Sequence, residues 1–143
     1  MRTIDPRILI LLILILPFCA IAQVEETFAD GNFSDNPTWD GNTELFIVSD
    51  NVLQSQSDGA ATYYLTTPST QSVQTEWGFF INLKFSTSGA NYVDVYLIAD
   101  AADLTLVNNG YFVRIGNTPD EISLYSLFDG VEMLLIDGTD GMV

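Results

Sequence analysis

Hydrophobic and polar positions alternate along most of the chain after residue 22, with the period of two that is typical of β-strands. The longest alternation covers Thr75–Phe85, whose apolar face includes Trp77 and is predicted to be buried, and a second covers Asn91–Ala99. Similar shorter segments predict strands at Leu45–Ser49, Val52–Gln56, Ala61–Thr66, Tyr111–Ile115, Glu121–Phe128 and Val131–Ile136. No sustained helical period with caps is present, and Asp100–Val107 is expected to be a loop. The pattern therefore predicts an all-β chain.

Turn dipeptides separate the predicted strands. Six of the ten glycines follow an aspartate, and Asn109-Gly110 adds a further turn. Such dipeptides accept the positive φ angles that tight hairpins require. Phe128-Asp129-Gly130-Val131 is the clearest two-residue hairpin. Many short strands joined by turns predict an antiparallel β-sandwich or jelly roll.

The first 22 residues have the three regions of a secretory signal peptide. Two arginines precede an unbroken aliphatic run at Ile8–Leu16, and Pro17 and the small residues Ala20 and Ala22 follow it. The aliphatic stretch is shorter than a typical membrane span, so cleavage before Gln23 is favoured over anchoring. The sequence therefore predicts a signal peptide at 1–22, a β-sandwich domain at 23–143, and a secreted or cell-surface protein.

Composition limits the chemistry of the exported chain. The sequence has 19 acidic and 4 basic residues, no histidine, and a formal net charge of −15. Loss of the leader would remove the single cysteine and leave Lys84 and Arg114 as the basic residues. The charge argues against nucleic-acid and anionic-membrane partners, and the lack of histidine excludes Ser-His and Cys-His catalysis.

Two segments of the predicted sheet, Asn109–Gly116 and Asp120–Tyr125, resemble the central strands of bacterial concanavalin A-like (laminin-G-like) jelly rolls. Glu26–Phe33 and Asn36–Gly41 are similar to the N-terminal edge of these domains. The resemblance implies a concanavalin A-like antiparallel β-sandwich over roughly Glu25 to Val143. It also implies a place in large secreted surface proteins, with lamin-tail and C-terminal sorting domains downstream in the same protein.

Domains of this type are usually longer at the C-terminus, with an Arg-rich strand, a Gly-x-Trp hairpin and a closing strand. The resemblance therefore implies that the jelly roll is incomplete at Val143 and that the sequence is the N-terminal part of a longer domain. A short natural variant is the alternative.

The outward faces of four predicted strands suggest a carbohydrate platform. If these strands are neighbours in a meander, one surface carries Tyr92, Asp94, Tyr96, Phe112, Arg114, Glu121, Ser123 and Tyr125. Sugars stack on aromatic rings and hydrogen-bond to fixed polar groups, so this set predicts a glycan or polysaccharide ligand. The alternative is an ordinary solvent-facing or domain-contacting surface, in which Arg114 pairs with Asp94 or Glu121.

The sequence favours a non-catalytic recognition or adhesion module. The superfamily includes laminarinase-type glycoside hydrolases, whose carboxylates alternate on one strand as Glu-x-Asp-x-x-Glu, and this sequence has no such run. A divergent hydrolase therefore stays the weaker alternative, and a purely structural domain without a ligand is the other.

Oxygen-rich loops make calcium a candidate ligand, and no other cofactor is indicated. The residues that would supply oxygen ligands are Asp30, Asn32 and Asp35 in the first loop and Asp137 and Asp140 in the last turns. Carboxylate and amide oxygens are the ligands that Ca²⁺ prefers, but no EF-hand spacing is present, and the same residues also form turns.

Overall fold

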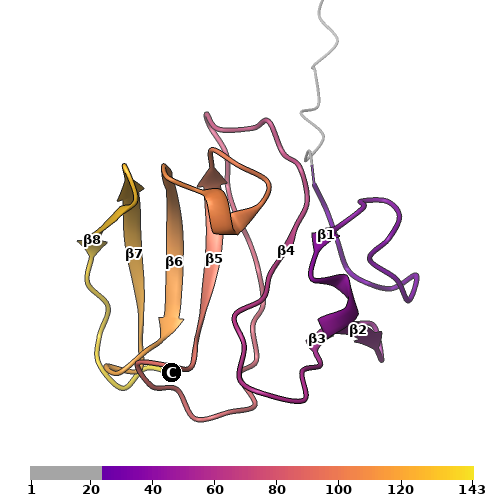
Figure 1. Ribbon diagram of the computed structural model, residues 1–143, viewed down its shortest axis with the longest axis horizontal. Coiled ribbons are helices and arrows are strands. Elements are labelled where there is room, and N and C mark those ends of the chain that lie inside the picture. Colours follow the sequence, from indigo (N-terminus) through magenta and orange to yellow (C-terminus); the bar gives the residue numbers. More distant parts are fainter. Residues whose placement is uncertain (1–23) are drawn as a thin grey trace, which may run out of the picture.

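The structure, a computed structural model, describes residues 24–143; the predicted signal peptide lies outside the described residues. The described chain is all-β and antiparallel, as predicted (Figure 1). The strands are β1 (Asp40–Gly41), β2 (Phe46–Ser49), β3 (Val52–Ser55), β4 (Leu65–Thr66), β5 (Tyr92–Ala99), β6 (Gly110–Gly116), β7 (Glu121–Phe128) and β8 (Val131–Ile136). Short 3₁₀ turns η1 (Thr43–Leu45) and η2 (Leu104–Leu106) lie between them. None of the helices formed by residues 24–143 is long and apolar enough to cross a membrane.

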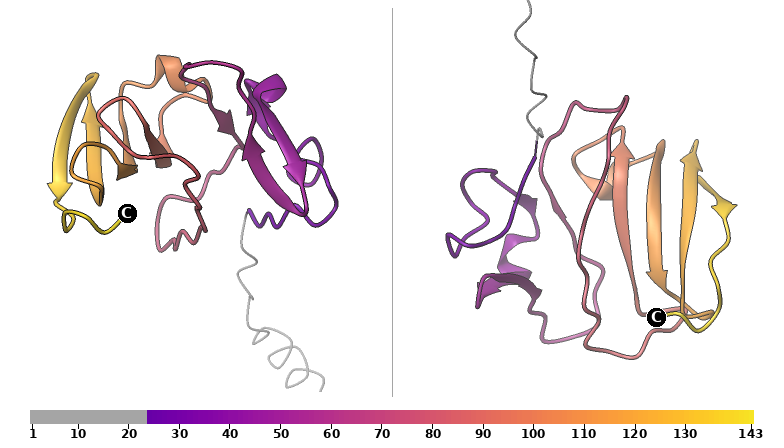
Figure 2. Two further views of the ribbon diagram at one scale, coloured as in Figure 1. Left: turned by 90° about the horizontal axis from the view of Figure 1, so that it is seen from below. Right: turned by 180° about the vertical axis from the view of Figure 1, so that it is seen from behind.

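Residues 24–143 form three sheets. β1 pairs with β4, β2 pairs with β3, and β5 to β8 form a four-stranded meander in chain order. Figure 1 shows β8 at the outer edge of the meander, whereas the long segment between β4 and β5 runs beside β5. Seen from below in Figure 2, this segment lies between the meander and the β2–β3 hairpin. The meander is therefore the element that can support an extended surface.

The two-residue hairpin between β7 and β8 is confirmed. Phe128 faces Val131 across the ladder, and Asp129 and Gly130 have φ angles of 49° and 76°. Two successive positive φ angles characterise the type I′ turn, whose twist matches that of the flanking strands. The Asp-Gly dipeptide therefore fixes where β7 ends and β8 begins.

The strand predicted at Thr75–Phe85 is wrong. The segment has no strand structure, and its aromatic side chains are exposed: Trp77, predicted to be buried, is 41% exposed, and Phe80 is 89% exposed. Alternation gives a segment one apolar face, but a strand also needs a neighbour for its backbone N–H and C=O groups. Within residues 24–143 no strand pairs with this segment. For the same reason the strand predicted at Ala61–Thr66 shortens to β4.

Gly116 ends β6 where another segment approaches it closely. Its φ is +99°, and a Cβ built there would lie 2.5 Å from Cγ2 of Thr87. Thr87 is itself fixed, because its hydroxyl donates a hydrogen bond to the carboxylate of Asp120. The position therefore requires glycine on both conformational and steric grounds.

We expect Gly116→Ala to lower the free energy of unfolding by about 1–3 kcal/mol, because alanine would be forced into a strained backbone conformation and against Thr87. Denaturant unfolding measures this loss. Gly59→Ala is the matched control, since Gly59 has no positive φ and nothing within 4 Å of the added Cβ. Equal stability of the two variants would contradict this account of Gly116.

Candidate functional site

The meander brings the predicted platform residues onto one face. Strand register places Tyr92 opposite Gly116, Asp94 opposite Arg114, and Tyr96 opposite Phe112, and the next pair of strands places Phe112 opposite Tyr125. Directly opposite residues of an antiparallel pair share a face. We call this the platform face: Tyr92, Asp94, Tyr96, Phe112, Arg114, Glu121, Ser123 and Tyr125, with Glu132 and Leu134 of β8.

Arg114 lies at the centre of the platform face and is held by two carboxylates. Its Nε and Nη2 donate to the two carboxylate oxygens of Asp94, both at 2.8 Å. Nη1 and Nη2 donate to the two oxygens of Glu132, both at 3.1 Å. The bonds to Asp94, and then those to Glu132, raise the pKa of the guanidinium above its ordinary value, although burial opposes the shift. Arg114 is therefore a permanently charged link between β5, β6 and β8.

Aromatic rings surround this ion pair. The guanidinium carbon lies 4.4 Å from the ring centroid of Tyr92, 5.1 Å from that of Tyr125 and 5.2 Å from that of Phe112. Such distances give favourable cation–π attraction, which is stronger where water is excluded. Phe112 and Tyr125 stack with an interplanar angle of 5° and centroids 5.3 Å apart, and Tyr96 packs on Phe112 at 5.1 Å. The rings therefore form one continuous ladder across β5, β6 and β7.

The platform face is more buried than the sequence indicated. Phe112 is 0% exposed, because the rings of Tyr96 and Tyr125 and the guanidinium of Arg114 pack around it. Ser123 and Glu121 are also buried. The expectation that these three side chains face solvent is wrong, and the accessible part of the platform face is its rim, where Tyr92 is 40% exposed.

The C-terminal turn covers one end of the platform face. The backbone N–H of Gly138 donates to the Ser123 hydroxyl, which donates in turn to Oε1 of Glu121. Met142 and Val143 both donate backbone N–H groups to the carbonyl of Asp120. Glu121 is therefore part of a structural anchor for the tail, and it makes no ion pair with Arg114, which was one of the two predicted pairings.

Glu132 is the site residue that the sequence analysis missed as a partner of Arg114. A register shift occurs opposite Leu124 and Tyr125, which pair with Ile136 and Leu134 respectively. Glu132 faces Leu127 on the hairpin side of this shift, so the two-residue turn between β7 and β8 places it on the platform face. The recognisable signal was charge: in an acidic chain with few cations, an arginine on a sheet attracts more than one carboxylate.

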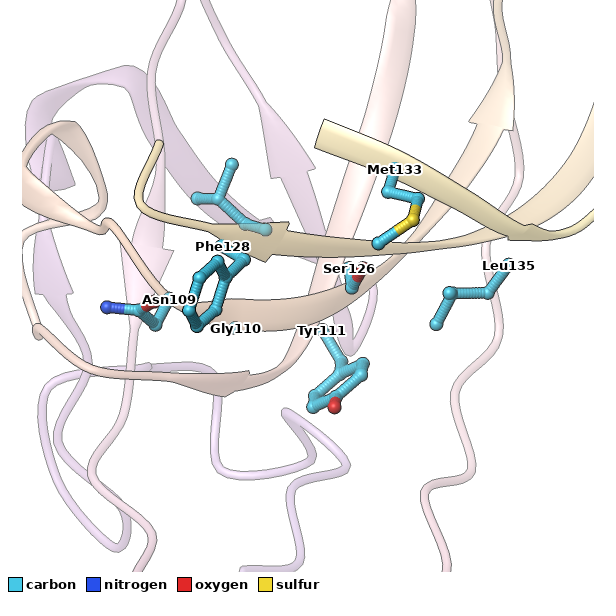
Figure 3. A pocket seen from close by; sticks show the side chains of 8 residues that line it. Asn109, Gly110, Tyr111, Ser126, Phe128, Met133 and Leu135 are labelled. Carbon is cyan, nitrogen blue, oxygen red and sulfur yellow. The ribbon is translucent and has the colours of Figure 1, made fainter. Parts of the chain in front are cut away.

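The reverse side of the meander, which we call the apolar face, carries no charged side chain. Its register rows consist of Val93, Ile115 and Ile122; Val95, Val113, Leu124 and Ile136; and Ile98, Tyr111, Ser126 and Met133. An open hollow of about 570 Å³ lies on this face next to β8 (Figure 3). Tyr111 of β6, Ser126 of β7, and Met133 and Leu135 of β8 are among the residues that line it. All four charged residues of the meander thus lie on the platform face.

The residues predicted to bind calcium lie in two separate places. The first loop holds Asp30, Asn32 and Asp35, and the last turns hold Asp137 and Asp140. Figures 1 and 2 show these indigo and yellow segments on opposite sides of the molecule. Asn32 Oδ1 accepts backbone N–H groups of Ser34 and Asp35, and Asp30 accepts from Asn32, so these side chains stabilise the turn. Among residues 24–143 no three acidic, cysteine or histidine side chains group as a metal site, and calcium binding stays a prediction.

Removal of Arg114 should destabilise the sheet. We expect Arg114→Met to lower the free energy of unfolding by about 2–3 kcal/mol, because Asp94 would stay partly buried without its partner. Arg114→Lys should recover part of this loss, since lysine keeps the charge but lacks the planar fork. Lys84→Met removes the same charge from an exposed position outside the strands and is the control. Arg114→Met as stable as Lys84→Met would contradict a structural role for the ion pair.

The Tyr96 hydroxyl should lose its proton at a higher pH than an ordinary tyrosine. Burial, followed by the charges of Asp94 and Glu132, raises its pKa above the ordinary value of 10.0. A pKa raised by folding contributes stability that is complete below the pKa of the unfolded chain and is lost as pH rises through the folded pKa. Tyr96→Phe should therefore weaken the fall in stability on the alkaline side, as measured by unfolding at a series of pH values. An unchanged alkaline profile would show that Tyr96 does not contribute.

Comparison with known proteins finds no family, no curated protein and no solved structure that matches this chain.

Proposed function

We propose that the protein is an exported, non-catalytic carbohydrate-recognition or adhesion module of a bacterial surface protein, built on a concanavalin A-like jelly roll. The platform face is the surface we propose for binding, and a neutral glycan is the ligand class that fits it. The observation that carries the proposal is the rigid cluster in which Arg114 joins Asp94 and Glu132 beside the exposed ring of Tyr92.

The rim of the platform face has the groups that sugars need. Tyr92 is 40% exposed, and the side chain of Glu132 is 46% exposed. Aromatic surface binds the apolar face of a pyranose ring, while carboxylate oxygens accept hydrogen bonds from its hydroxyl groups. Because the ion pair fixes these groups on three strands, binding would cost little conformational entropy.

Charge indicates that the glycan is neutral. The single cation of the platform face makes four hydrogen bonds to carboxylates, so it has little capacity left for an anionic sugar. Two carboxylates against one guanidinium give the cluster a net negative charge, which repels uronate and sulfate groups. Neutral polysaccharides are therefore the first class to test.

The same hydrogen bonds support a binding role over a catalytic one. Hydrolysis of a glycosidic bond requires one carboxyl group that donates a proton and a second carboxylate that attacks or activates water. Both oxygens of Asp94 and both oxygens of Glu132 already accept from Arg114. A hydrolase remains the weaker alternative for this reason.

A structural domain without a ligand is the second candidate function. The face-to-face stack of Phe112 on Tyr125 favours it, because ring faces that pack on each other are not available to a sugar. The aromatic ladder would then serve to hold the meander together, and the rim would be ordinary surface.

Binding to insoluble and soluble neutral polysaccharides tests the proposal. We expect Tyr92→Ala and Tyr96→Ala each to weaken polysaccharide binding roughly 2- to 10-fold, because each removes one aromatic contact with the sugar. Tyr111→Ala is the matched control, since Tyr111 is 47% exposed on the apolar face. No retention on any neutral polysaccharide, with the protein folded, would favour the structural role, and release of reducing sugar would favour the hydrolase.

A further inference from the structure

Strand β8 is an open edge of the meander. All six of its residues are exposed, with Val131 at 68% and Ile136 at 61%. Within the described part of the chain, its outer side pairs with no strand, and the tail after it turns toward Ser123 on β7 and Asp120 in the turn between β6 and β7. Figures 1 and 2 show nothing beyond β8. At the opposite edge, by contrast, six of the eight residues of β5 are partly buried.

The composition of β8 leaves this edge unprotected. Val131-Glu132-Met133-Leu134-Leu135-Ile136 has no proline and no lysine, the residues that proteins commonly use to block edge pairing. Its one charge, Glu132, lies on the platform face and is paired with Arg114. Unpaired N–H and C=O groups beside apolar side chains are a template for an added strand.

Acidic residues bracket this edge. Asp129 precedes β8 and Asp137 follows it, and both are exposed. They lie eight positions apart, which spans at most about 26 Å in an extended chain. An added strand would therefore meet a negative charge near each of its ends, whichever direction it runs.

The same two aspartates disfavour pairing of β8 with a second copy of this chain. Antiparallel pairing of two β8 strands would bring Asp129 of one copy toward Asp137 of the other at both ends, and like charges opposite each other on paired strands are destabilising. The copies are also acidic throughout, with a formal net charge of −15 each. The charge pattern instead complements a basic partner.

We propose that β8 is a docking edge for an extended peptide segment of a partner protein, with alternating apolar residues and a lysine or arginine at each end. Backbone pairing along β8 would supply affinity, and the partner's apolar side chains would extend the apolar face beside Met133 and Leu135, where the open hollow lies. This site is distinct from the proposed glycan surface and does not depend on it.

The probe is the blocked nonapeptide Lys-Thr-Val-Thr-Val-Thr-Val-Thr-Lys, titrated into the whole protein and followed by backbone amide NMR shifts. We expect saturable shifts concentrated in residues 131–136. The Asp129→Asn, Asp137→Asn double variant should bind roughly 2- to 30-fold more weakly, the effect of losing two exposed charge pairs. Asp50→Asn with Asp58→Asn is the control, because it removes the same charge from exposed turns elsewhere.

A peptide with glutamate at both ends should bind more weakly, and a peptide with proline at its centre should not bind. If the double variant does not fold, raised salt on the unmodified protein must weaken binding of the lysine peptide. Shifts centred on β5, equal binding of the glutamate peptide, or no shifts would overturn the proposal. Concentration-dependent dimerisation through β8 without peptide would also overturn it in favour of a second copy. Tyr92→Ala should leave peptide binding unchanged, so a failure of the glycan proposal can be distinguished from a failure of the peptide proposal.

Discussion

The ion pair between Arg114 and its two carboxylates is the interaction on which the four-stranded sheet depends. Arg114 makes bidentate contacts to Asp94 on one neighbouring strand and to Glu132 on β8, and three aromatic rings pack around it. The carboxylates need this partner because they lie on a face that also buries Phe112. In a chain with 19 acidic residues, Arg114 thus allows two carboxylates to lie on the same face of the sheet.

Much of the meander could be predicted from the sequence. The Asp129-Gly130 turn is a local signal, and the strands Glu121–Phe128 and Val131–Ile136 have the bounds that alternation predicted. The common face of Tyr92, Asp94 and Tyr96 also follows from period two alone. These features depend only on neighbouring residues, and for this reason the sequence was sufficient.

The features that the sequence analysis missed depend on contacts between distant segments. Thr75–Phe85 has a strand pattern but no strand to pair with. Glu121 and Ser123 are buried by the tail that follows β8, and Glu132 reaches Arg114 from two strands away. The glycan, calcium and surface-protein expectations, by contrast, remain predictions.

The chain-order topology of the meander has a consequence for folding. Each of its strands pairs with the strand that follows it, and the last two are joined by only two residues. Contacts of this kind are local in sequence, so little chain entropy is lost before they form, and such contacts speed folding. The pairing of β1 with β4, by contrast, joins Asp40 to Thr66 across a longer loop. We therefore expect the meander to form early in folding and the β1–β4 pairing to form later.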